Sequence, residues 1–226
     1  MEKDRLHTSK TSAWKWVPSL YFAEGLPYVA VITIAVIMYK RLGLSNTEIA
    51  LYTSWLYLPW TIKPLWSPFV DLLKTKRWWI ITMQALIGAA MAGIAFFIPT
   101  HFYVQASLAC FWLMAFSSAT HDISADGFYM LGLSEGEQSF FVGIRNTFYR
   151  FANIFGQGIL VMIAGWIEQR SGNIPLAWSL VFYFMAGLFI ALTLYHSYIL
   201  PRPINDTKTE GINGKGLWEN FLKTFI

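Results

Sequence analysis

The chain has 226 residues, of which 55% are hydrophobic and only 13% are charged, and its net charge is +4. Soluble domains carry about 25% charged residues, so this composition excludes an ordinary soluble domain and indicates a membrane protein. The basic excess lies beside apolar runs, which argues against a nucleic-acid partner, and a single cysteine, Cys110, excludes a disulfide framework and a thiol-ligand metal site; we expect no cofactor.

Six apolar segments are long enough for membrane helices, because a helix needs about 20 residues to cross the hydrocarbon core. In chain order they cover residues 16–38, 49–70, 78–98, 102–130, 140–166 and 174–200. The fourth segment is the least apolar, since its C-terminal part holds two aspartates and several hydroxyl side chains. Short connections favour antiparallel neighbours. The sequence therefore predicts an all-α membrane protein, with a six-helix transmembrane bundle over residues 16–200.

Polar segments flank this bundle. Residues 1–15 form a basic arm, and residues 201–226 form a polar linker that ends in a short amphipathic helix over residues 217–223. Lysine and arginine concentrate in the arm, in the tail and in the link after the second segment. Because short cytoplasmic loops carry the basic excess, we expect both termini to be cytoplasmic, with residues 1–15 as a cytoplasmic arm.

Six ionisable side chains lie inside the apolar segments, and they are Glu24, Lys63, Asp122, Asp126, Arg145 and Arg150. Each costs about 2.5 to 3.5 kcal/mol at a helix centre, so each must be paired or face water. Counting the helical rise from the segment ends places Glu24 and Arg150 near the midplane, where we predict that they pair. We expect Asp122 to pair with Arg145, and Lys63 to extend towards the headgroups.

Polar residues on the fifth segment share one helix face. Asn146, Arg150, Asn153 and Gln157, here called the polar stripe, are spaced four, three and four residues apart. Tyr21, Glu24 and Tyr28 share a face of the first segment in the same way. Together these faces predict an aqueous, aromatic-walled opening suited to a sugar-like ligand. The predicted substrate-binding residues are Tyr21, Glu24, Tyr28, Asn146, Arg150, Asn153 and Gln157.

We assign proton coupling to Glu24, Asp122 and Asp126, because ionisable groups inside a membrane mark transport pathways by default. Static ion pairs are the alternative. Glu24 and Arg150 would then only lock two helices together, and Asp122, Asp126 and Arg145 would form a structural network at a cytoplasmic gate.

Several motifs resemble known transporters. Residues 67–77 resemble the loop signature of the major facilitator superfamily, in which an aspartate, here Asp71, precedes a basic cluster. A narrower resemblance is to the AmpG-type muropeptide permeases and the related acetyl-CoA transporters. It is carried by residues 25–27, 63–68, 118–123 with Asp126-Gly127, and 149–150.

This resemblance implies the N-terminal half of a major facilitator fold, built from two inverted three-helix repeats, with the C-terminal half missing. It implies a proton-driven importer of a muropeptide or sugar-like cell-wall fragment in the bacterial inner (plasma) membrane, working by alternating access. A transporter of another anionic solute, such as a CoA thioester, is the alternative. The resemblance also assigns gate or structural roles to Asp71, Lys76, Arg77 and Arg145.

Two other classes of protein compete with a transporter. His121 and Asp126 have the spacing of a catalytic pair in some intramembrane acyltransferases, but five residues on a helix place them about 140° apart around the axis. A non-transporting sensor or scaffold would have no need for the polar stripe. We therefore predict a transporter that is not an enzyme, with membrane lipid, protons and a small solute as its partners.

Overall fold

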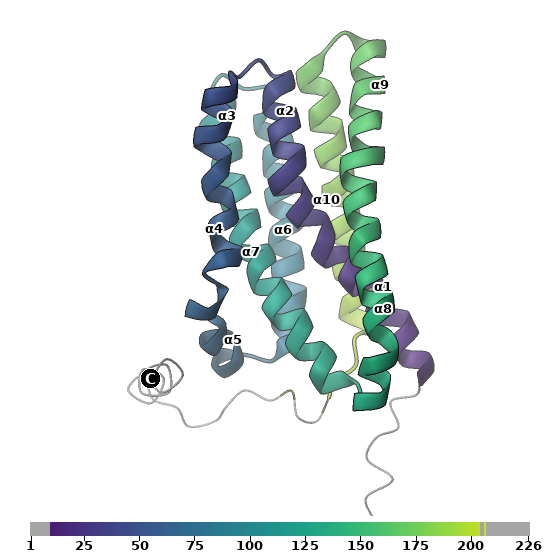
Figure 1. Cartoon of the computed structure of the whole chain (residues 1–226). Helices are drawn as coiled ribbons and strands as arrows, with labels where there is room; N and C mark the ends of the chain where they lie inside the picture. Colours follow the sequence, from purple (N-terminus) through teal and green to yellow (C-terminus); the bar gives the residue numbers. More distant parts are fainter. Residues whose placement is uncertain (1–9, 204–205, 207–226) are drawn as a thin grey trace, which may run out of the picture.

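The computed structural model describes residues 10–203 and residue 206, and all regular structure in this part of the chain is helical. The helices form six passes that run alternately up and down, so that α1 begins and α10 ends at the same end of the bundle (Figure 1). The first pass consists of α1 (Lys10–Val29), η1 (Ala30–Ile34) and α2 (Ala35–Arg41). The second consists of α3 (Asn46–Thr53), η2 (Ser54–Tyr57), α4 (Leu58–Thr61), η3 (Lys63–Leu65) and α5 (Ser67–Leu73). The remaining passes are α6 (Lys76–Phe97), α7 (Tyr103–Gly132), α8 (Glu135–Ile154) with η4 (Phe155–Leu160) and α9 (Val161–Ser171), and α10 (Ile174–Ile199).

Four helical stretches are long and apolar enough to cross a membrane, and they are Ala13–Arg41, Lys76–Phe97, Glu135–Ser171 and Ile174–Ile199. The second and fourth passes do not meet this criterion, although α7 has 30 residues. The first helix begins at Lys10, earlier than the predicted bundle start at residue 16. The predicted amphipathic helix over residues 217–223 lies outside the described residues.

The second pass is broken, where the sequence predicts a continuous helix over residues 49–70. Pro59, Pro64 and Pro68 each sit at the first or second position of a short helical piece. Proline has no N–H and its ring clashes with the preceding turn, so it favours the start of a helix and disrupts a helix interior. The break leaves Lys63 at the start of a single 3₁₀ turn, η3, from which its side chain reaches α7.

Glycines allow the first and fifth passes to cross closely. A Cβ atom on Gly25 would lie 2.7 Å from the carbonyl oxygen of Tyr149 and 3.0 Å from the Cβ atom of Ala152. A Cβ on Gly156 would overlap the side chain of Val29. The π-helical turns η1 and η4 contact each other near this crossing, and η1 follows Pro27. The crossing fixes which face of α8 meets α1.

The first pass is the most buried of the four long apolar stretches. α6 packs between α7 and α10, and α1 packs against α8, α7 and α10. The larger apolar core includes Ile34, Phe111, Phe182 and Phe189, all of which are fully buried. A smaller core around Trp16 and Phe128 lies at the end where α1 begins. These two cores hold the first and fourth passes together, and the acidic residues of both passes are described next.

Candidate functional site

Three carboxylates gather between α1 and α7. One side-chain oxygen from each of Glu24, Asp122 and Asp126 lies within 4.8 Å of those of the other two residues. Asp122 and Asp126 are one turn apart on α7 and therefore share a helix face, which is turned towards Glu24 on α1. Glu24 is only 8% exposed. We call these three residues the carboxylate cluster.

Two basic side chains from other passes neutralise part of the cluster. Lys63 forms an ion pair with Asp122, and the guanidinium of Arg145 on α8 lies 2.9 Å from Asp126. Asp126 also accepts a hydrogen bond of 3.1 Å from the hydroxyl of Tyr21. Arg145 lies 4.6 Å from the ring centre of Tyr21, so cation–π attraction adds to the ion pair.

Glu24 has no basic partner of its own among the described residues, and its Oε2 atom is buried without a hydrogen-bond partner. With every group ionised, the cluster would therefore hold three negative charges against two positive ones. Burying an uncompensated charge is costly. Chemically, such an arrangement can accept one more positive charge, as a proton or as a small cation.

An aromatic-walled pocket opens beside the cluster. Its volume is about 280 Å³. Its lining residues come from the first, second, fourth and fifth passes, and they are Glu24, Tyr28, Tyr57, Trp60, Lys63, Asp122 and Tyr149. The rings of Tyr28 and Trp60 meet edge to face with their centres 5.2 Å apart, and Tyr57 is 49% exposed. The pocket thus combines aromatic walls with two carboxylates and one ammonium group.

The predicted pairs differ from those that form. Arg145 pairs with Asp126 instead of Asp122, and Lys63 pairs with Asp122 instead of extending to the headgroups. Glu24 and Arg150 form no ion pair, because the α8 face that meets α1 contains Tyr149 and Ala152, and Arg150 is turned away from it and exposed.

The polar stripe lies mostly on the open surface of α8 and η4. Asn146, Arg150 and Gln157 are exposed, and Asn153 is partly buried and donates a hydrogen bond of 2.9 Å to the Tyr149 carbonyl. Of the predicted substrate-binding residues, Glu24 and Tyr28 line the aromatic pocket, and Tyr21 lies behind the cluster on Asp126. The structure therefore separates the predicted binding residues into an inner and an outer group.

The predicted gate residues tie the second, third and sixth passes together. Lys76 forms an ion pair with Asp71 and packs against Gly127 on α7. Arg77 donates hydrogen bonds to the carbonyls of Ser197 and, at 3.3 Å, Leu200. The carboxylate of Asp206 accepts from the backbone N–H groups of Lys76 and Arg77, at 2.6 and 3.1 Å. These contacts hold the start of α6 to the end of α10.

A second buried polar group was missed by sequence analysis. Gln84 on α6 bonds to His196 on α10 and to His121 on α7, each at 2.9 Å, and His196 bonds in turn to Ser19 on α1 at 2.9 Å. The two histidines and Gln84 are fully buried. A glutamine in the middle of an apolar helix was the sequence feature that could have indicated it.

This network bears on the acyltransferase alternative. The ring of His121 bonds to Gln84, whereas the oxygens of Asp126 bond to Arg145 and Tyr21. Asp126 therefore does not orient His121, and His121 is 0% exposed. His121 and Asp126 therefore do not form the pair of base and orienting residue that the acyltransferase alternative requires.

Comparisons with known proteins give relatives of greater length. An uncharacterized protein of Schizosaccharomyces pombe is 23% identical over 181 residues, which cover 66% of this chain and 34% of the relative. An uncharacterized protein of Haemophilus influenzae is 30% identical over 152 residues, which cover 61% of this chain and 32% of the relative. The chain spans about a third of the length of the curated relatives it matches.

The family comparison matches residues 22–139 to the BT1 family, the folate/biopterin transporter family, which is related to the major facilitator superfamily. This supports the resemblance to that superfamily, whereas the narrower resemblance to muropeptide permeases and acetyl-CoA transporters stays a prediction. The matched region contains Glu24, Lys63, Asp122 and Asp126, and thus the whole carboxylate cluster. The chain belongs to the BT1 family.

Proposed function

We propose that this chain is the N-terminal half of a proton-coupled secondary transporter that works by alternating access. All six passes cross the membrane over residues 16–200, with residues 1–15 and 201–226 in the cytoplasm, and a C-terminal half completes the fold. Family membership, four helices of sufficient length and the alternating passes support this architecture. The chain's coverage of about a third of its relatives agrees with a larger whole protein.

One observation carries the proposal of proton coupling. The carboxylate cluster lacks one positive charge, and the unpartnered oxygen belongs to Glu24 at its buried end. A proton on Glu24 balances the cluster when the site is closed, and its release to water leaves a negative charge that favours the open state. Asp122 and Asp126 are each paired with a basic side chain, Lys63 and Arg145, which leaves Glu24 as the carboxyl group without such a partner. Coupling then requires only that one carboxyl group alternates between two protonation states.

The pocket favours a flat, polar heteroaromatic solute of the folate or pterin type. Tyr28, Trp60 and Tyr149 offer ring faces and edges, and the carboxylates of Glu24 and Asp122 accept hydrogen bonds from ring N–H groups. Lys63 offers a donor to a ring carbonyl. At about 280 Å³ the pocket lies near the lower end of the usual range for ligand sites, so it takes one ring system, and the C-terminal half covers the rest of the solute.

A muropeptide or another sugar-like cell-wall fragment in the bacterial inner membrane is the second candidate. It is favoured by the aromatic walls, on which a sugar ring can stack, and by the motif residues Asp122 and Asp126. A CoA thioester would need more cationic groups than Lys63 provides within this pocket.

Uptake by the full-length protein in proteoliposomes tests the proposal. An inward proton gradient is imposed, and uptake of labelled folate or biopterin is compared with uptake of a labelled anhydro-muropeptide. We expect gradient-dependent uptake of the pterin-type solute that is abolished by a protonophore. If only the muropeptide is taken up, the proposed solute class is wrong but the proposal of a proton-coupled transporter stands. If none of these solutes shows gradient-dependent uptake, both the solute class and the proton-coupled transporter are contradicted.

A further inference from the structure

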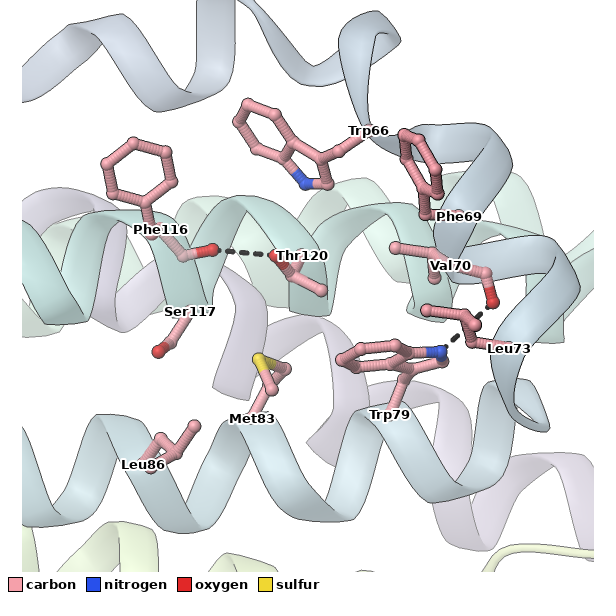
Figure 2. Close-up of a pocket in the computed structure, with 10 residues that line it drawn as sticks. All are labelled: Trp66, Phe69, Val70, Leu73, Trp79, Met83, Leu86, Phe116, Ser117 and Thr120. Atoms are coloured by element: carbon pink, nitrogen blue, oxygen red, sulfur yellow. Dashed lines mark hydrogen bonds between the residues drawn. The ribbon is translucent and has the colours of Figure 1, made fainter. Parts of the chain in front are cut away.

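An apolar groove lies between α5, α6 and α7, on the opposite side of α7 from the carboxylate cluster. Its volume is about 330 Å³, and Figure 2 shows the side chains that line it. Thr120 in the groove and Asp122 in the cluster are two residues apart on α7, which places them about 200° apart around the helix. Phe116 and Leu73 on its rim are 42% and 45% exposed, so the groove opens to the outside of the bundle.

Two tryptophans line this groove, and only one of their indole N–H groups has a hydrogen-bond acceptor among the described residues. The Nε1 atom of Trp79 donates a hydrogen bond of 3.0 Å to the carbonyl of Val70. The Nε1 atom of Trp66 is buried and has no partner among the described residues, and Figure 2 shows it turned towards the groove. Buried donors nearly always have an acceptor, and an unpaired donor is most costly in a lipid environment. The groove therefore lacks one hydrogen-bond acceptor.

A cation without an ionic partner among the described residues follows α5 directly in the sequence. Lys74 follows the lining residue Leu73, is exposed, and lies 5.6 Å from the ring centre of Trp78. Within the described part of the chain it forms no ion pair, whereas its neighbour Lys76 is held by Asp71. The ammonium group of Lys74 thus remains available to an anion at the membrane surface.

We propose that this groove binds one acyl chain of an anionic phospholipid. The chain lies along Met83, Leu86 and Phe116, its ester carbonyl accepts the hydrogen bond from Trp66, and its phosphate meets Lys74. Trp66 and Lys74 flank α5 and are eight positions apart, or roughly 12 Å along the helix axis, a distance that the glycerol phosphate and the lysine side chain bridge together. The site is separate from the transport pocket and does not depend on the proposed function. It would anchor the broken second pass against α6 and α7.

Native mass spectrometry of the delipidated full-length protein tests the site, with phosphatidylglycerol and phosphatidylcholine of identical chains as probes. We expect preferential binding of phosphatidylglycerol. Lys74→Gln should weaken phosphatidylglycerol about fivefold, since one lysine near a surface contributes this much to anionic-lipid binding. It should weaken phosphatidylcholine less, because the choline group offsets the charge of the phosphate that both lipids carry. Trp66→Phe should weaken both lipids, because the carbonyl contact is shared. Lys15→Gln, an exposed lysine at the same end of the bundle, is the matched control and should change neither.

Leu86→Trp should fill the groove while leaving the Lys74 ammonium group and the Trp66 indole N–H in place. It should therefore displace both lipids, and it tests the site even if Trp66→Phe is unstable. Glycerol phosphate without acyl chains should not compete. Equal binding of the two lipids, or unchanged phosphatidylglycerol binding in Lys74→Gln, would contradict the proposed preference for an anionic headgroup. Lipid that persists at wild-type level in Leu86→Trp would overturn the groove as its site.

Discussion

The carboxylate cluster and the polar stripe are both groups of polar side chains on the helices of the bundle, but they differ in the partners that they have within the described residues. The cluster forms ion pairs with Lys63 and Arg145 and accepts a hydrogen bond from Tyr21. The stripe leaves Arg150 exposed on α8, without an ion pair among the described residues. We therefore expect the ion pairs of the cluster to contribute to the stability of this chain, whereas the exposed stripe depends on water, on a solute or on the proposed C-terminal half.

Removal of Lys63 should have the largest effect on stability. Lys63→Ala leaves Asp122 unpaired beside Glu24, and we expect a loss of about 2–3 kcal/mol in the free energy of unfolding. This lies below the roughly 3–5 kcal/mol of a fully buried pair, since the Lys63 side chain is 31% exposed. Thermal unfolding in detergent measures the loss. The double variant Lys63→Met with Asp122→Asn should recover most of it, and wild-type stability of Lys63→Ala would show that the pair is not structural.

Adding a side chain at the close crossing of the first and fifth passes should have the next largest effect on stability. Gly25→Ala places a methyl group 2.7 Å from the Tyr149 carbonyl oxygen, and we expect a loss of about 1–3 kcal/mol from overpacking. Gly165→Ala on α9 is the matched control, because no atom beyond its own stretch of helix lies within 4 Å of the place that the new methyl group would take, and it should be neutral or slightly stabilising. Equal destabilisation by both changes would contradict the close crossing.

Changing the stripe should affect stability least. Arg150→Gln should alter the free energy of unfolding by less than about 0.5 kcal/mol, as exposed substitutions do. Solute uptake should nevertheless fall about tenfold, the effect of losing one charge-assisted hydrogen bond. Arg170→Gln, an exposed arginine over Trp166, serves as the control. Normal uptake by Arg150→Gln would place the stripe outside the transport path.

The course of the passes was largely predictable from sequence, because length and hydropathy depend on local composition. The predicted segments 78–98 and 174–200 agree closely with α6 (Lys76–Phe97) and α10 (Ile174–Ile199). The second segment differs because three prolines break it, and their effect on an apolar run is not apparent from hydropathy alone.

The partners within the site could not be predicted in the same way. Depth along a helix follows from counting residues, but rotation about the axis depends on which face meets the neighbouring helix. Gly25 meets Tyr149 and Ala152, and this contact turns Arg150 outwards and brings Arg145 to Asp126. The residues of the cluster were therefore identified from sequence, whereas their pairing required the packing of α1 against α8.

The most direct test of the account separates coupling from binding in Glu24→Gln, with Glu135→Gln, an exposed glutamate at the start of α8, as the control. Uptake driven by a proton gradient and exchange of labelled for unlabelled solute at equal pH are measured in the same proteoliposomes. If Glu24 carries the coupled proton, Glu24→Gln should lose gradient-driven accumulation and its pH dependence while exchange continues at a rate close to that of the wild type. Gradient-driven uptake with an unchanged pH dependence in this variant would contradict the assignment of Glu24.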